Sequence, residues 1–168
     1  MDGGFDALPS GETSPVLSPS GDVVFFGTDA NKLYAFNTSD GSDKWDTPFQ
    51  TGGELNTSPI ISTDGETVFV GSIDKKVYAV NTADGSEKWK FPTGGAVRAS
   101  SPALSPDGDT VFLGSEDGKV YAIDAATGAM TVADAVLNFE DTASYTVFVT
   151  ATDSGDLTST ATVTVDLV

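Results

Sequence analysis

Short apolar segments and short polar turns alternate along most of the chain. Residues 67–72 and 76–81 show the pattern best: both are rich in β-branched and aromatic residues, which favour strands, and a polar turn separates them. Residues 67–72 are apolar at neighbouring positions, which is typical of a strand buried on both faces. No segment shows the 3.6-residue spacing of an amphipathic helix, so the pattern predicts an all-β protein.

Turn residues divide the first three quarters of the chain into units of four strands. In the best-defined unit the predicted strands are residues 58–62, 67–72, 76–81 and 87–91. Asp64-Gly65 separates the first two, and glycine adopts the positive φ of such a turn at little cost. We interpret the acidic turns as turn formers rather than metal ligands; they are Asp64-Gly65, Asp107-Gly108-Asp109 and Glu116-Asp117-Gly118.

This unit occurs three times. Ser-Pro dipeptides begin at Ser14, Ser58 and Ser101, which are 44 and 43 residues apart, and Val-Phe-x-Gly segments and Tyr-Ala dipeptides repeat with the same spacing. We therefore predict a domain of residues 1–128 with three units, at about 14–50, 58–95 and 101–128. Four short strands in each unit predict the blades of an open or partial β-propeller, and a stacked solenoid of sheets is the alternative.

A longer motif follows the third strand of two units. Ala35-x-Asn37-x-x-x-Gly41-x-x-x-Trp45 is repeated at Ala79 to Trp89, and it resembles the tryptophan-docking motif of PQQ-like (quinoprotein-type) propeller repeats. The resemblance covers about residues 5–128, with Asn in place of the family's Asp and Ser in place of the Lys after Gly. It implies that Trp45 and Trp89 are structural and pack between adjacent blades.

Three blades do not close a ring, since propellers have about four to eight. We therefore expect that the chain is part of a longer protein, or that copies of it complete one another.

The pattern changes after the third unit, and residues 129–168 form a second predicted domain. The order of motifs over about residues 123–168 resembles the C-terminal half of a bacterial cadherin-like repeat, with an Ile-Asp-x-x-Thr-Gly turn at Ile123 and a Tyr-x-x-x-Val-x-Ala-x-Asp-x-Gly segment at Tyr145. We predict a long β-hairpin in a half sandwich. Residues 130–133 fit either the fourth strand of the third blade or a cadherin strand.

The cadherin-like resemblance implies a calcium site. Acidic residues that correspond to Glu140 and Asp153 help to bind Ca²⁺ between successive cadherin repeats, and Ca²⁺ takes six to eight oxygen ligands. The half repeat supplies only part of such a set. The alternative is that both carboxylates are solvated or stabilise turns.

Composition removes several classes of function. The net charge of −17 disfavours binding to nucleic acid or anionic lipid, and no apolar run is long enough to insert into a membrane. The chain has no Cys and no His, which excludes thiolate and imidazole metal sites and His-dependent catalytic triads. Quinoprotein dehydrogenases use a closed ring and often a pair of Cys residues, so we expect neither PQQ nor any other organic cofactor; calcium is the one ion that the sequence leaves open.

These observations predict a non-enzymatic structural or adhesion-type protein that associates with copies of itself through incomplete sheet edges, as a dimer or a filament. The alternative is a protein- or ligand-binding propeller module from a larger bacterial surface or periplasmic protein. We expect an extracellular or cell-surface location, with the periplasm as the alternative, and other surface proteins as further partners.

Overall fold

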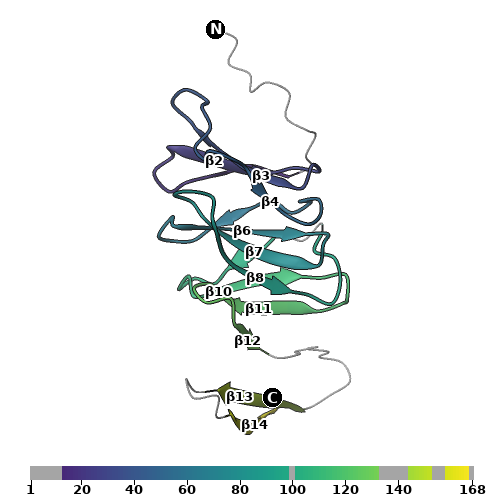
Figure 1. The fold of residues 1–168 in the computed structure, drawn as a ribbon. Helices are drawn as coiled ribbons and strands as arrows, with labels where there is room; N and C mark the ends of the chain where they lie inside the picture. The colour runs from purple at the N-terminus through teal and green to yellow at the C-terminus, as the bar shows by residue number, and fades with distance from the viewer. Residues whose placement is uncertain (1–12, 99–100, 133–143, 153–157, 167–168) are drawn as a thin grey trace. The chain divides into compact units, whose positions relative to one another are not determined.

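Three antiparallel sheets of four strands make up the first part of the chain (Figure 1). The computed structural model describes residues 13–98, 101–132, 144–152 and 158–166. The first sheet contains β1 (Val16–Leu17), β2 (Val23–Gly27), β3 (Lys32–Asn37) and β4 (Phe49–Gln50). The second contains β5 (Ile60–Ile61), β6 (Thr67–Ser72), β7 (Lys76–Asn81) and β8 (Glu87–Pro92). The third contains β9 (Ala103–Leu104), β10 (Thr110–Gly114), β11 (Val120–Asp124) and β12 (Met130–Val132).

Within each sheet the strand order follows the chain, as in a propeller blade. The all-β prediction with three four-stranded, propeller-type blades is therefore confirmed. Of the two interpretations of residues 130–133, the fourth strand of the third blade agrees with β12, which is Met130–Val132; Ala133 lies outside the described residues.

Acidic turns connect the strands as their sequence predicts. Between β7 and β8, Asp84 Oδ1 accepts hydrogen bonds from Ser86 N at 2.9 Å and Ser86 Oγ at 2.7 Å, and Gly85 adopts a φ of 76°. The side-chain hydrogen bond from Ser86 lowers the pKa of Asp84. These local bonds satisfy the carboxylate inside its own turn.

The core lies between successive sheets. Each sheet has a leading face, toward the preceding sheet, and a trailing face, toward the following one. Side chains alternate along a strand, so Val68 and Val70 of β6 pack with the first sheet while Phe69 packs with the third. All six residues of β6 are buried, which agrees with the prediction that this strand is covered on both faces.

The segments just before the first strands of the three sheets are also linked to one another. Ser14 N donates to Ser58 Oγ at 2.8 Å, and Ser58 N donates to Ser101 Oγ at 3.2 Å. The repeated Ser-Pro dipeptide therefore contributes one hydrogen bond from each sheet to the next.

The chain divides into two compact units, Met1–Thr131 and Val132–Val168. In the second unit β13 (Ser144–Thr152) pairs with β14 (Thr158–Asp166) in an antiparallel hairpin, with Tyr145 opposite Val165 and Thr152 opposite Thr158. The predicted hairpin is present, whereas its cadherin-like character stays a prediction. In the part of the chain that the structure describes, no helix is long and apolar enough to cross a membrane.

Candidate functional site

Trp45 and Trp89 lie at the two junctions between sheets. Trp45 is 4% exposed, and its Nε1 donates to the carbonyl oxygen of Thr82 in the next sheet at 2.9 Å. Trp89 is 8% exposed and donates in the same way to Ala125 at 3.0 Å. Both indoles are therefore held from two directions, by apolar packing and by one hydrogen bond.

Each indole lies against a turn glycine of the next sheet. A Cβ atom at Gly85 would lie 2.7 Å from Trp45 Cδ2, and one at Gly128 would lie 2.8 Å from Trp89 Cδ2. Real Cβ atoms do not approach this closely, and both glycines adopt a φ of about 75° that also disfavours other residues. These turns therefore require glycine for two independent reasons.

The two departures from the family motif contact each other. Asn81 Nδ2 donates to Ser86 Oγ at 2.8 Å, and Asn37 Nδ2 donates to Ser42 Oγ at 3.0 Å. Asn and Ser thus form a neutral hydrogen bond at the positions where the family pattern has Asp and Lys. The paired substitution leaves the turn closed without either charge.

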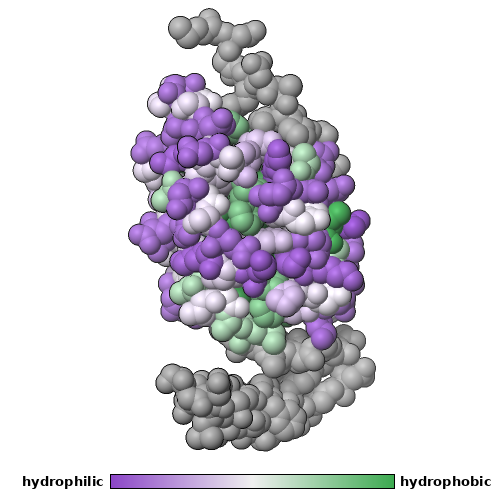
Figure 2. All heavy atoms as spheres, viewed as in Figure 1, coloured by the Kyte–Doolittle hydropathy of each residue, from purple (hydrophilic) through white to green (hydrophobic). Residues whose placement is uncertain are grey.

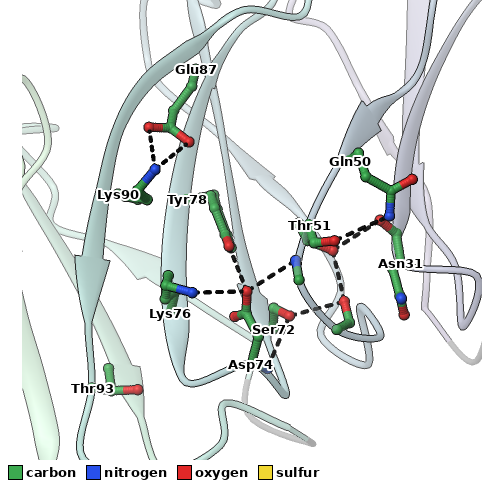
Figure 3. A network of polar contacts seen from close by, with 12 residues as sticks. Asn31, Gln50, Thr51, Ser72, Asp74, Lys76, Tyr78, Glu87, Lys90 and Thr93 are labelled. Carbon is green, nitrogen blue, oxygen red and sulfur yellow. Dashed lines mark hydrogen bonds and ion pairs between the residues drawn. The ribbon is translucent and has the colours of Figure 1, made fainter.

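A second junction lies at the opposite end of β7, where sequence reasoning found no site (Figure 3). Asp74 Oδ2 accepts a hydrogen bond from Tyr78 Oη at 2.5 Å. It accepts another, at 3.0 Å, from the backbone N of Gly52, which lies in the crossing loop, the segment that leads from one sheet to the next. Lys76 Nζ is 3.3 Å from the same oxygen, and the Asp74 side chain is only 8% exposed. Burial raises the pKa of the Tyr78 hydroxyl, and the hydrogen bond to Asp74 raises it further.

The third sheet repeats this arrangement. Tyr121 Oη donates to Asp117 Oδ2 at 2.6 Å and accepts from the backbone N of Gly94 at 2.9 Å. The hydrogen bond from Tyr121 lowers the pKa of Asp117, and burial raises the pKa of Tyr121. The first sheet has Ala30 at the corresponding position.

The crossing loops approach these aspartates closely. A Cβ atom at Gly52 would lie 2.6 Å from Asp74 Oδ2, and one at Gly95 would lie 2.4 Å from Asp117 N. One feature of the sequence signals this junction. Thr-Gly-Gly occurs at residues 51–53 and at residues 93–95, and in each case an Asp follows the first glycine by 22 or 23 residues.

The groove between the second and third sheets holds about 180 Å³. Its acidic lining comes from three turns, and Lys88 lies among the carboxylates with its Nζ 3.0 Å from Thr67 Oγ1. Hydrogen bonds from Ser62, Ser105 and Thr127 lower the pKa of Asp64, Asp107 and Asp124 respectively. These three carboxylates accept hydrogen bonds within their own turns, and the groove offers negative charge.

In residues 13–98 and 101–132, no three acidic side chains converge as metal ligands. One buried oxygen, Asp74 Oδ1, has no hydrogen-bond partner among the described residues. Glu140 and Asp153, the predicted calcium ligands, lie outside the described residues, and calcium binding stays a prediction.

A family model described as "Outer membrane protein assembly factor BamB" matches residues 6–164. The chain belongs to this family. Among solved structures, BamB from Moraxella catarrhalis is similar with a TM-score of 0.65 and 25% sequence identity. The similarity covers 76% of this chain and 38% of that chain, so this chain spans well under half of its solved relative. No curated protein matches.

These comparisons confirm the PQQ-like propeller part of the resemblance. The family match extends through residue 164, into the segment that the sequence analysis compared with cadherin-like repeats. That second resemblance remains a prediction.

Proposed function

We propose that this chain is a non-catalytic, protein-binding propeller module that acts in the assembly of outer membrane proteins. The observation that carries the proposal is the family match over residues 6–164, since the family model describes an outer membrane protein assembly factor. This favours the binding module over the adhesive protein that the sequence analysis put first.

The geometry supports a rigid scaffold that presents turns to a partner. Two junctions hold each pair of neighbouring sheets, one at Trp45 or Trp89 and the other at Asp74 or Tyr121. Polar residues cover most of the described surface in the view of Figure 2. A net charge of −17 favours a partner with a basic surface, because complementary charge speeds association.

The proposal includes no quinone. PQQ is itself a polycarboxylate, and the groove between the second and third sheets is lined by Asp64, Asp107, Asp109 and Asp124, which would repel it. It places the chain in the periplasm, where outer membrane proteins are assembled, in preference to the cell exterior.

Site-specific photo-crosslinking in the periplasm of a Gram-negative host tests this function. A photoreactive residue replaces Ala83, which is exposed in the β7–β8 turn, and tests the edge of the sheets that carries the acidic turns. In a second variant it replaces Lys75, which is exposed in the β6–β7 turn, and tests the opposite edge, where the crossing loops lie. We expect one position to capture the same envelope protein repeatedly and the other to capture much less of it. Adducts at neither position, or adducts that follow protein abundance at both, would refute the proposal.

Calcium is tested on the same chain. If Glu140 and Asp153 bind Ca²⁺, isothermal titration will show a site that Asp153→Asn removes; no heat of binding to the unaltered chain rejects that prediction.

A further inference from the structure

The β6–β7 turn of the second sheet has two unfavourable features that the corresponding turns avoid. The first is Lys75, which adopts a left-handed backbone conformation with a φ of 68°. Gly118 holds this position in the third sheet and Asn31 in the first, with φ values of 82° and 64°, and both residue types tolerate the conformation. Two of the three repeats therefore place a suitable residue at this position, and the second places a lysine.

The second feature is Asp74 Oδ1, which is buried and has no hydrogen-bond partner among the described residues. The equivalent oxygen of the third sheet, Asp117 Oδ1, accepts a hydrogen bond from the backbone N of Lys119 at 3.2 Å. An unsatisfied buried acceptor costs free energy. One turn thus combines two local costs, and such outliers gather at binding sites, where the surrounding structure holds them in place.

Backbone hydrogen bonds hold this turn in its conformation. The N of Lys75 donates to the carbonyl oxygen of Ser72 at 3.2 Å, and its own carbonyl oxygen accepts from the N of Thr93 at 2.8 Å. These bonds do not require a lysine, since the N of Thr51 makes the same bond to the carbonyl oxygen of Asn31 at 2.9 Å in the first sheet. The feature that is particular to the second sheet is therefore the lysine side chain.

The Lys75 side chain is exposed and makes no hydrogen bond or ion pair within the part of the chain that the structure describes. The neighbouring Lys76 differs, because its Nζ lies 3.3 Å from Asp74 Oδ2 (Figure 3). The six residues of β7 separate Lys75 from the acidic turn at Asp84 by about 20 Å, which exceeds the Debye length at physiological salt. The turn therefore presents one uncompensated positive charge at its tip.

We propose that Lys75 is a contact residue for the partner of this module and pairs with a carboxylate on an acidic segment of that partner. The inference rests on the proposed function, and it adds the edge of the sheets that is used and the chemistry of the contact. A partner that is basic elsewhere is attracted by the acidic turns, and the carboxylate opposite Lys75 fixes its orientation. The rigid turn holds the lysine at the tip before binding, which reduces the ordering cost of association.

The test uses the full chain in the periplasm of a Gram-negative host, with a photoreactive residue in place of Pro92. Pro92 is exposed and lies opposite Lys76 across β7 and β8, so Lys75 itself is kept. The yield of one adduct, identified by mass spectrometry, is compared among the unaltered chain, Lys75→Arg, Lys75→Gly and Lys75→Glu. Lys44→Glu is the matched control, because Lys44 is exposed beside the acidic turn at Asp40.

We expect Lys75→Gly to lower the adduct yield about fivefold, although it removes the backbone strain and raises the thermal midpoint. A purely structural lysine would not separate the two readouts, since a more stable chain would capture the partner at least as well. Lys75→Arg should retain most of the yield, Lys75→Glu should lose more than Lys75→Gly, and Lys44→Glu should lose little. The captured peptide should contain Asp or Glu, and changing that residue to Lys should restore capture by Lys75→Glu.

Equal yields from the unaltered chain and Lys75→Gly overturn the contact. A loss in Lys44→Glu as large as that in Lys75→Glu also overturns it, since net charge alone would then explain both. Failure of the charge exchange overturns the pairing with a carboxylate. Adducts at Ala83 with none at Pro92 overturn this inference and leave the proposed function intact, whereas the absence of adducts at Ala83, Lys75 and Pro92 alike contradicts both.

Discussion

Replacement of Trp89 tests whether the indole holds the second and third sheets together. Truncation of a buried Trp to Ala removes its packing and leaves a cavity, which costs about 3–5 kcal/mol. Trp89 is 8% exposed and packs with Phe69, whose ring centroid is 5.7 Å from its own. Since a whole domain is stable by about 5–15 kcal/mol, Trp89→Ala should bring this junction close to unfolding at 25 °C.

The conservative variant separates packing from hydrogen bonding. Trp89→Phe retains an aromatic ring but leaves the carbonyl oxygen of Ala125 without its donor at 3.0 Å. An unsatisfied buried acceptor costs about 1–3 kcal/mol, so this variant should lose less stability than Trp89→Ala.

The assay uses the fact that the chain has only two Trp residues. In either Trp89 variant, urea unfolding followed by fluorescence reports on Trp45 alone, at the other junction, while circular dichroism follows all strands. We expect the dichroism midpoint to fall before the fluorescence midpoint in Trp89→Ala, as in repeat proteins whose neighbours stabilise one another. A loss below about 1 kcal/mol in Trp89→Ala would refute the role given to the indole.

Three further outcomes follow from the structure. Lys75 has a φ of 68°, which costs a non-glycine residue about 1 kcal/mol, so Lys75→Gly should raise the thermal midpoint; a lower midpoint contradicts this. Gly94→Ala should cost about 1–3 kcal/mol because its Cβ would lie 2.3 Å from Asp117 Oδ2, and unfolding curves should show partial rescue when Asp117→Ala is added. Because the pKa of Asp84 is lowered in the folded state, its contribution to stability is present above the unfolded value of about 3.8 and is lost as the pH falls through the folded pKa. The thermal midpoints of Asp84→Asn and the unaltered chain should therefore converge below about pH 4.

The repeat and its strands could be read from the sequence because local patterns determine them. The predicted strands at residues 67–72 and 76–81 coincide with β6 and β7, and the predicted strand 87–91 is one residue shorter than β8. The predicted strand 58–62 is longer than β5, which contains only Ile60–Ile61. The backbone N of Ser58 donates to Ser101 in the next sheet. The backbone N of Ser62 donates to Thr67 at the start of β6 and its carbonyl oxygen accepts from Gly65, so this end of the predicted strand forms the turn into β6.

The second junction could not be read in this way. Asp74 and Gly52 are 22 residues apart, and only the stacking of two sheets brings them within 3.0 Å. The sequence pattern of the two Gly-Gly pairs suggests linkers. Glycine is required at these positions because of contacts with the next sheet, and no turn of the pairs themselves signals that requirement.

The two junctions at each sheet pair have a mechanical consequence. One lies at the Asp74 end of β7 and the other at the Thr82 end, where Trp45 is bound. Two neighbouring sheets therefore cannot rotate apart about either edge without breaking the contacts at the opposite edge. A force or torque applied to the first sheet should be transmitted to the third with little deformation. The described sheets would therefore move as one rigid body when a partner binds at either end.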